Sequence, residues 1–371
     1  MRTRWPVLLA LLLAACHEPS NHGRGGDFAM LTRADPGYQQ ALPGMPIEFP
    51  RDHGMHPGFR IEWWYLTANL EDDQGRPFGV QWTLFRTASS PPGTAASGNP
   101  WQDPQVFMAH FAISTPTDHM AFQRYARGGE HEGLAQAGVQ AKPFMAWLDD
   151  WTLQSAGPEW LPLGLRARQD GYAVELELNA DRPPVLQGTG GFSQKHPEGG
   201  GSHYYSQPFL SAIGTLIIDH VAIRVKGKAW LDREWSSQFL QPDQEGWDWF
   251  ALHLDSGEKL MVFQLRPVGN QGKPYVHAAL VDREGNKQSL DSSGIRLQII
   301  ERQRVAGREL PLHWRLELTG IDRVLDVRAL HPEQWLDVDF PYWEGVVRAR
   351  GDGPGSSGQG YLEMTGYPRA Q

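Results

Sequence analysis

Short strand-like segments bounded by turn residues recur along almost the whole chain, and no stretch shows a long helical period. In residues 163–178, two apolar runs are joined by Asp170-Gly171, which is a strong hairpin signal. Glu175 and Glu177 alternate with apolar residues in the second run, which indicates a strand with one wet face. The 41 glycines and 28 prolines supply the many turns that such strands need. The sequence therefore predicts an all-β protein.

The strand segments fall into two series separated by a polar segment. Residues 241–246 (Gln-Pro-Asp-Gln-Glu-Gly) are the best candidate for an interdomain linker, and a length of 371 residues favours two domains. Each series holds roughly enough strands to close a barrel of about eight. Two sandwiches would give much the same pattern, so periodicity leaves both architectures open. We expect one domain in residues 47–240 and another in residues 247–371.

The N-terminus has the parts of a secretory signal. A basic start is followed by an apolar run over residues 6–15, which is shorter than the roughly 20 residues that a membrane-spanning helix needs. The run ends at Leu13-Ala14-Ala15-Cys16, which resembles the lipobox of bacterial lipoproteins. We therefore expect a signal peptide in residues 1–15 and a lipid on Cys16. The alternative is an ordinary signal peptide with a chance cysteine.

The segment after the expected cleavage site is polar and glycine-rich. We interpret residues 16–46 as the lipidated cysteine and a flexible tether. His17, rather than aspartate, follows Cys16, and by resemblance to sorting in Gram-negative bacteria this favours the outer membrane, facing the periplasm. Since Cys16 is the only cysteine, the domains are held together by their cores rather than by disulfides.

Composition and missing motifs exclude several classes of function. The net charge is −9 with both signs mixed and no basic stripe, so nucleic acid is not an expected partner. The chain has no Gly-x-Ser-x-Gly, no His-Glu-x-x-His and no cysteine pairs, so neither a serine hydrolase nor a metal site is expected. No cofactor is predicted. The 15 tryptophans favour a wide cavity lined with aromatic rings.

An ordered set of segments resembles one known family. The segments are Glu62-Trp63-Trp64-Tyr65, Met108-Ala109-His110-Phe111-Ala112, His203-Tyr204-Tyr205-Ser206, Trp230-Leu231-Asp232-Arg233-Glu234-Trp235-Ser236, Gly246-Trp247-Asp248-Trp249-Phe250, Tyr342-Trp343-Glu344-Gly345 and Gly360-Tyr361-Leu362-Glu363-Met364-Thr365-Gly366-Tyr367. Together they resemble the lipocalin-like family of AttH-type proteins and carotenoid 1,2-hydratases, whose bacterial members often carry the label of secreted hydrolases. The resemblance implies two consecutive lipocalin-like (calycin-type) β-barrels.

The segment 230–235 is the main candidate for chemistry. If it is a strand, Trp230, Asp232 and Glu234 share one face, and the two acids lie about 7 Å apart at roughly 3.3 Å per residue. Carboxyl groups in a closed cavity beside an indole can have raised pKa values and donate a proton, and the indole can stabilise a carbocation. The alternative is a set of ion pairs at the barrel rim.

The resemblance also contains a departure. The hydratases carry histidine and aspartate just before the matching tryptophan, whereas here Asp232 and Trp235 keep the pattern and Arg233 replaces the histidine. This departure argues against carotenoid hydration itself and leaves a related activity open.

The segment 62–65 is the second candidate. On a strand, Glu62 shares a face with Trp64, and the opposite face carries Trp63 and Tyr65. Glu62 is either an acid that orients a ligand or the partner of Arg60. We expect Glu62, Trp64, Asp232 and Glu234 to converge on one cavity in the N-terminal barrel. His110 and Tyr204 or Tyr205 are expected nearby, although each has a purely structural interpretation as well.

The predicted function is that of an envelope lipoprotein that binds an apolar ligand, an isoprenoid or a lipid, with hydratase- or isomerase-like acid chemistry in the N-terminal barrel. The alternatives are a lipid carrier without chemistry and a structural envelope lipoprotein. The candidate catalytic residues are Asp232, Glu234 and Glu62, and the candidate ligand-binding residues are Trp63, Trp64, His110, Tyr204, Tyr205 and Trp235.

Overall fold

The computed structural model describes residues 35–93, 103–128, 136–290, 292–353 and 355–370. The expected signal peptide, Cys16 and the first part of the expected tether lie outside the described residues. Strands, turns and short 3-10 helices make up the described chain. The fold-class prediction is confirmed, because the strands form two barrel-like sheets.

The first sheet has 13 strands and contains every strand before residue 237. In space the main path runs β4-β3-β2-β1-β13-β12-β9-β8-β7-β6-β5, and β10 and β11 pair with β12. The strands are β1 (Ile61–Glu71), β2 (Pro77–Ala88), β3 (Gln105–Ser114), β4 (His119–Arg127), β5 (Ala137–Ala141), β6 (Phe144–Leu148), β7 (Trp151–Ser155), β8 (Leu163–Gln169), β9 (Tyr172–Asn179), β10 (Val185–Leu186), β11 (Phe192–Gln194), β12 (Gly201–Ile218) and β13 (Val221–Ser236).

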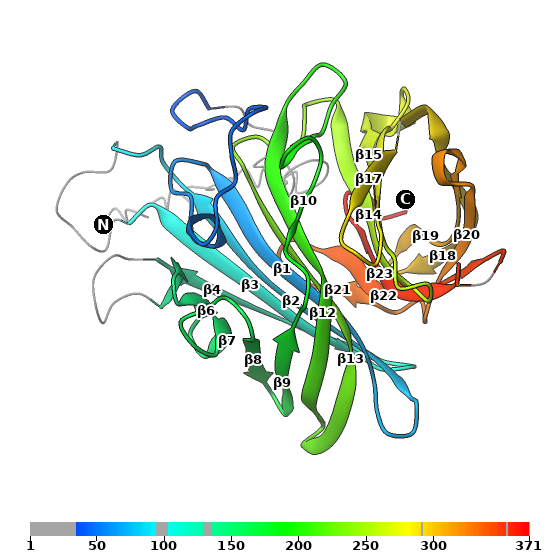
Figure 1. The fold of residues 1–371 in the computed structure, drawn as a ribbon, viewed down its shortest axis with the longest axis horizontal. Helices are drawn as coiled ribbons and strands as arrows, with labels where there is room; N and C mark the ends of the chain where they lie inside the picture. Colours follow the sequence, from blue (N-terminus) through cyan, green and yellow to red (C-terminus); the bar gives the residue numbers. More distant parts are fainter. Residues whose placement is uncertain (1–34, 94–102, 129–135, 291, 354, 371) are drawn as a thin grey trace, which may run out of the picture.

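The second sheet has ten strands and begins at Gln244. Its main path is β17-β16-β15-β14-β23-β22-β20-β19-β18, with β21 paired to β22. The strands are β14 (Gln244–Leu254), β15 (Lys259–Pro267), β16 (Tyr275–Val281), β17 (Lys287–Leu290), β18 (Ile295–Val305), β19 (Arg308–Leu318), β20 (Arg323–Ala329), β21 (Trp335–Leu336), β22 (Tyr342–Gly351) and β23 (Gly358–Met364). Figure 1 shows this sheet, coloured yellow to red, beside the first.

The chain passes from one sheet to the other over residues 237–243. The segment interpreted as a linker, residues 241–246, overlaps this connection, but residues 244–246 already belong to β14. Among the described residues, no helix has the length and apolar character needed to cross a membrane.

The hairpin predicted around Asp170-Gly171 is confirmed. These two residues join β8 to β9 with positive φ angles of 49° and 89°, as the tightest hairpin turns require. Glu175 and Glu177 are exposed while Val174, Leu176 and Leu178 are buried, which gives the predicted wet face.

The segment before residue 47 is not a free tether over its described part. Tyr38 is buried and donates a hydrogen bond from its hydroxyl to the carbonyl of Ala88, 2.9 Å away, and Ala41 is also buried. The amide of Gln39 donates to the carbonyl of Gly58 at 2.9 Å. The packed part of the chain therefore begins before Ile47, because the hydroxyl of Tyr38 binds the end of β2 and Ala41 packs in a cluster with Phe59 and Trp235.

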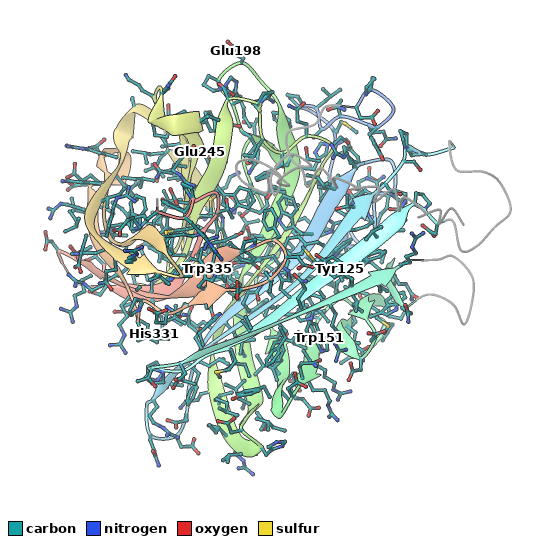
Figure 2. All side chains as sticks on the ribbon, turned by 180° about the vertical axis from the view of Figure 1, so that it is seen from behind. Tyr125, Trp151, Glu198, Glu245, His331 and Trp335 are labelled. Atoms are coloured by element: carbon teal, nitrogen blue, oxygen red, sulfur yellow. The ribbon has the colours of Figure 1, made fainter. Side chains whose placement is uncertain are left out.

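Each sheet encloses its own apolar core, and a third cluster lies between the sheets. Trp82 and Trp151 belong to the first core, and Trp314 belongs to the second. Trp230 of β13 and Trp249 of β14 belong to the cluster between the sheets. Figure 2 shows the side chains of the described residues on both sheets, with Trp151 on the first and Trp335 on the second.

The side chains of β13 are exposed in its first half and become buried in its second half, which the second sheet covers. Residues 221–228 are largely exposed, whereas residues 229–236 are all buried. Ten of the 11 residues of β1 are also buried or half-buried, on both faces. A strand with two covered faces can hold polar groups away from bulk water on each side.

Candidate functional site

The pairing of β1, β13 and β12 decides which candidate residues can meet. Directly paired residues of neighbouring strands project from the same face of a sheet. Asp232 pairs with Tyr65 on one side and Ser206 on the other. Glu234 pairs with Trp63 and Tyr204 in the same way. This outer face of the first sheet, which carries Asp232 and Glu234, is turned toward the second sheet.

The other candidates project from the opposite face, the inner face of the first sheet. Glu62 pairs with Trp235, and Trp64 pairs with Arg233. Trp64 belongs to the core enclosed by the first sheet. The strand register therefore places Glu62 and Trp64 on the face opposite to that of Asp232 and Glu234. Of the four residues expected to converge, Trp64 lies away from the two acids, whereas Glu62 borders the same cavity as they do.

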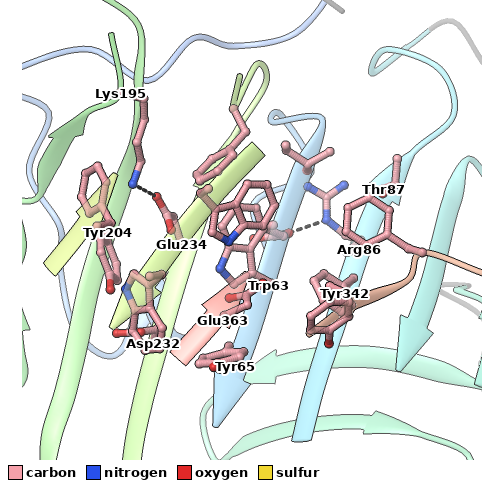
Figure 3. Close-up of a pocket in the computed structure, with 18 of the residues that line it drawn as sticks. Trp63, Tyr65, Arg86, Thr87, Lys195, Tyr204, Asp232, Glu234, Tyr342 and Glu363 are labelled. Carbon is pink, nitrogen blue, oxygen red and sulfur yellow. Dashed lines mark hydrogen bonds and ion pairs between the residues drawn. The ribbon is translucent and has the colours of Figure 1, made fainter. Parts of the chain in front are cut away.

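A cavity of about 100 Å³, counted as the space open to the centre of a water molecule, lies between the two sheets. It is not inside the N-terminal barrel, where we expected it. Figure 3 shows Asp232, Glu234 and Tyr204 on one side, facing Trp63, Tyr342 and Glu363. Its aromatic lining also includes Phe85, Phe239, Trp247, Trp249, Phe263 and Phe340.

Five of the nine candidate residues border this cavity. They are Glu62, Trp63, Tyr204, Asp232 and Glu234. The four others, Trp64, His110, Tyr205 and Trp235, do not line it.

Asp232 lies in this cavity without a cation of its own. Its Oδ1 accepts hydrogen bonds from the indole of Trp230, at 2.9 Å, and from the hydroxyl of Ser206. The bond from Trp230 agrees with the predicted shared face. No basic side chain of the described chain forms an ion pair with Asp232. Burial, together with the negative charge of Glu234, raises the pKa of Asp232 to about 7.

Glu234 is only two residues away but has a cationic partner. Its Oε1 lies 2.8 Å from Nζ of Lys195, and both side chains are buried. The hydroxyl of Ser202 donates a second hydrogen bond to the same oxygen. Figure 3 shows the ion pair at one side of the cavity. Asp232 and Glu234 are therefore neighbouring carboxyl groups in different electrostatic settings.

The second sheet brings two more acids to the same place. Glu363 of β23 lines the cavity and pairs directly with Glu344 of β22. Glu344 is fully buried and accepts a hydrogen bond from the hydroxyl of Tyr65, 2.6 Å away. Burial and the charge of Glu363 raise the pKa of Glu344 well above its usual range. Burial, with smaller contributions from Glu234 and Asp232, raises the pKa of Glu363 to about 8.

His110 reaches the cavity only through another residue. Its Nδ1 lies 2.9 Å from the hydroxyl of Tyr342, which lines the cavity. Burial lowers the pKa of His110 to about 4, so the ring is neutral near pH 7. His110 therefore contacts Tyr342 and does not itself line the cavity.

Glu62 borders the cavity, but its carboxylate is bound by two arginines. Arg86 donates to Oε1 and Arg233 to Oε2, and Nδ1 of His56 lies 3.1 Å from Oε2. Although burial opposes ionisation, Arg86 and Arg233 hold the pKa of Glu62 well below its usual range. Glu62 is thus a permanent anion and not a proton donor near neutral pH. Arg60 was one alternative for the partner of Glu62, and the ion pairs observed are with Arg86 and Arg233.

The aromatic candidates of the inner face pack around the same arginine or near it. The guanidinium of Arg233 lies 3.8 Å from the ring centre of Trp64 and 4.9 Å from that of Trp235. The hydroxyl of Tyr205 lies 2.7 Å from Nδ1 of His53. These contacts build a cation–π and hydrogen-bond network behind the cavity wall.

Several residues that line the cavity, and Glu344 beside it, were not among the candidates. Glu363, Glu344, Tyr342 and Trp249 all fall in segments that carry the family resemblance, so the motifs themselves were a signal. Lys195 lies on the turn between β11 and β12 and has no such signal in the sequence. In the described part of the chain, no group of three or more histidine, cysteine, aspartate or glutamate residues could hold a metal ion.

The fold and cavity define a class of two-sheet, lipocalin-like β-proteins with an acidic, aromatic site between the sheets. The AttH-like family model matches residues 40–367, and the chain belongs to this family. A protein of Nitrosomonas europaea assigned to AttH has a similar crystal structure, with 35% identity and a TM-score of 0.78. The match covers 89% of this chain and 99% of that one. A search of curated proteins found no match.

Two more distant structures share the fold. Kievitone hydratase from Nectria haematococca is 15% identical with a TM-score of 0.60, and the match covers 91% of this chain and 94% of that one. CghA, solved with Sch210972, is 13% identical with a TM-score of 0.56, and the match covers 92% and 98% of the two chains. At these identities the likeness is one of fold.

Proposed function

We propose that the cavity between the sheets binds an apolar, unsaturated ligand, such as an isoprenoid or a lipid, and that its buried acids catalyse hydration or isomerisation of a carbon–carbon double bond. The observation that carries this proposal is Asp232, a buried carboxyl on an aromatic cavity with a pKa of about 7. A carboxyl that holds its proton near neutral pH can act as a general acid there.

The aromatic walls suit the intermediate that protonation would create. Protonating an alkene leaves a carbocation, which the faces of electron-rich rings attract. Trp63, Trp247 and Trp249 line the same cavity as Asp232. The name of the fold relative kievitone hydratase supports the same class of reaction, namely hydration.

The first experiment tests binding. N-phenyl-1-naphthylamine is a neutral apolar fluorophore, and its emission should rise when it enters the cavity. Replacing Trp249 with alanine removes one cavity wall and should weaken its binding at least tenfold, whereas Trp335→Ala, away from the lining of this cavity, should leave binding unchanged. Equal binding by the wild type and Trp249→Ala would contradict the cavity as the binding site.

The second experiment tests chemistry. Lipids that co-purify with the protein, and a panel of prenylated alcohols and phenols, are incubated with it in D2O. Proton donation by Asp232 to carbon should place deuterium on the ligand, which mass spectrometry detects. Asp232→Asn should bind N-phenyl-1-naphthylamine normally and lose deuterium incorporation. A carrier without chemistry, the second candidate, would bind apolar compounds and show no incorporation with either protein.

We also propose that the protein is anchored in the cell envelope by a lipid on Cys16. The junction Leu13-Ala14-Ala15-Cys16 supports this proposal. Cys16→Ser should abolish labelling of the protein by radioactive palmitate in intact bacterial cells, since the thiol is the group that accepts diacylglycerol. Equal labelling of both proteins would refute the anchor and leave the proposal for the cavity untouched.

A further inference from the structure

We propose that Lys195 is a positioning residue that keeps Glu234 ionised, so that the cavity holds a carboxylate base beside Asp232, a carboxyl group without a cationic partner. The reaction assigned to this pair rests on the proposed function. The two ionisation states do not, and they can be measured without any ligand.

The contact between Lys195 and Glu234 is enclosed. Their side chains are 4% and 6% exposed, and 2.8 Å separates Nζ from Oε1. The ammonium also lies over three rings, 4.4 Å from the centre of Phe263, 4.9 Å from Phe239 and 5.2 Å from Tyr204. A buried ammonium needs a counter-ion, and Glu234 is the carboxylate it pairs with. The rings fix the lysine in place, because leaving them would forfeit the cation–π contacts.

Asp232 lies on the same face two residues earlier and lacks this partner. The groups that donate hydrogen bonds to it, from Trp230 and Ser206, are neutral. Arg86 is the other basic residue lining the cavity, and it is bound to Glu62. The cavity therefore offers a cation to Glu234 and none to Asp232.

The titratable groups on the surrounding strands add no cation to Asp232 and leave Glu234 paired with Lys195. Tyr65 of β1 and Tyr204 of β12 are buried phenols whose pKa values are raised well above 10 by burial, so they are neutral. Glu363 of β23 faces the pair, and burial raises its pKa to about 8. Burial and the charges of Lys195 and Lys287 lower the pKa of His277, on β16, to about 4.

The pair can complete a hydration with balanced protons. Asp232 gives its proton to one alkene carbon, forming a C–H bond from the π electrons. A water molecule then attacks the adjacent cationic carbon, forming the C–O bond, and Glu234 takes the proton that this water releases. Asp232 ends ionised and Glu234 protonated, and exchange with solvent restores both. No oxidant or reductant is needed.

Infrared titration of the ligand-free protein tests the proposal. Protonated carboxyl groups absorb apart from carboxylates, so Asp232→Asn and Glu234→Gln assign the two bands. At pH 6 the spectrum of Asp232→Asn should lack a protonated-carboxyl band that the wild type has. The spectrum of Glu234→Gln should lack a carboxylate band that the wild type has. In Lys195→Met, Glu234 should become protonated, whereas Lys195→Arg should keep it ionised. A Glu234 carboxylate that stays ionised in Lys195→Met would overturn the proposal.

A second measurement serves if Lys195→Met does not fold, as judged by circular dichroism. In Glu234→Gln the titration midpoint of Asp232 should fall by about one to two pH units, the size of a Coulomb interaction at roughly 7 Å and an effective dielectric constant of about 20. An unchanged midpoint would mean that Glu234 carries no charge and would refute the proposal. Binding of N-phenyl-1-naphthylamine is measured on the same samples, so a failure of the proposed function is seen separately.

Discussion

On the inner face of β1 and β13, Glu62 is bound by Arg86 and Arg233, so two cations surround one carboxylate. On the outer face of the same two strands and the facing β23, the cavity is lined by three carboxyl groups, those of Asp232, Glu234 and Glu363, and its Lys195 forms an ion pair with Glu234. Both faces are buried.

The difference between the faces lies in the number of cations and not in burial. A buried carboxylate between two arginines stays ionised, whereas a buried carboxyl without a cation keeps its proton into the neutral range. Carboxyl groups on the two faces of the paired strands β1 and β13 thus differ in protonation, and the inner face stabilises the fold while the outer face holds the groups that can exchange protons.

The largest expected effect is on the inner face. Glu62→Gln leaves Arg86 and Arg233 buried without their anion and should lower the free energy of unfolding by about 3–5 kcal/mol. Guanidinium denaturation followed by tryptophan fluorescence measures this. Glu175→Gln is the matched control, because its ion pair with Arg166 is exposed on both sides and contributes about 0–1 kcal/mol. Equal losses in the two variants would contradict the comparison.

The second effect concerns the outer face and its dependence on pH. The pKa of Glu363 is raised in the folded protein, so the folded state binds a proton more tightly than the unfolded chain does. Stability from this group is therefore present below about pH 4.5 and is lost as the pH rises through about 8, by roughly 1.4 kcal/mol for each pH unit within that window.

Glutamine does not ionise, so Glu363→Gln should remove the loss of folding stability that Glu363 causes as the pH rises. Relative to the wild type, the melting temperature of the variant should therefore rise progressively between pH 5 and pH 8. The buried histidines affect both proteins alike, so the difference reports on Glu363 and on Glu344, whose pKa the charge of Glu363 raises. A difference in melting temperature that stays flat over this range would show that Glu363 is ionised throughout.

The smallest effect is on the hydrogen bond that links the two sheets behind the cavity. Tyr342→Phe removes the hydroxyl that His110 contacts at 2.9 Å and should cost about 1 kcal/mol of unfolding free energy. Tyr172→Phe, which removes an exposed bond to Asp219, should stay within about 0.5 kcal/mol of the wild type. A neutral Tyr342→Phe would mean that water replaces the lost contact.

The sequence could predict which side chains of β13 share a face of the sheet. It could not predict whether that face turns toward the core of the first sheet or toward the second sheet. The spacing of Trp230, Asp232 and Glu234 determines that they share a face, and the hydrogen bond from Trp230 to Asp232 agrees with it. Which face is covered by which sheet depends on strand pairing. Trp64 was therefore assigned to the wrong side, and Glu62 borders the cavity but is bound by Arg86 and Arg233, because a shift of one residue in register exchanges the two faces.

The location of the cavity depends on contacts between distant parts of the chain. Glu363 comes from the last strand, and Lys195 comes from a turn that looks like any polar loop in the sequence. Nothing local to Lys195 indicates that rings from β12, β15 and the connection between the sheets surround it. Motif resemblance pointed to the segments, and only the packing of the two sheets showed which of their side chains meet.

The common face of Asp232 and Glu234 also has a stereochemical consequence. Both side chains project in the same direction from one strand, so a flat ligand lying against β13 presents a single side to them. Hydrogen and hydroxyl delivered from these two positions would add to that one side of the double bond, giving syn addition. A migrating double bond would likewise lose and regain hydrogen suprafacially, and the product would be a single stereoisomer.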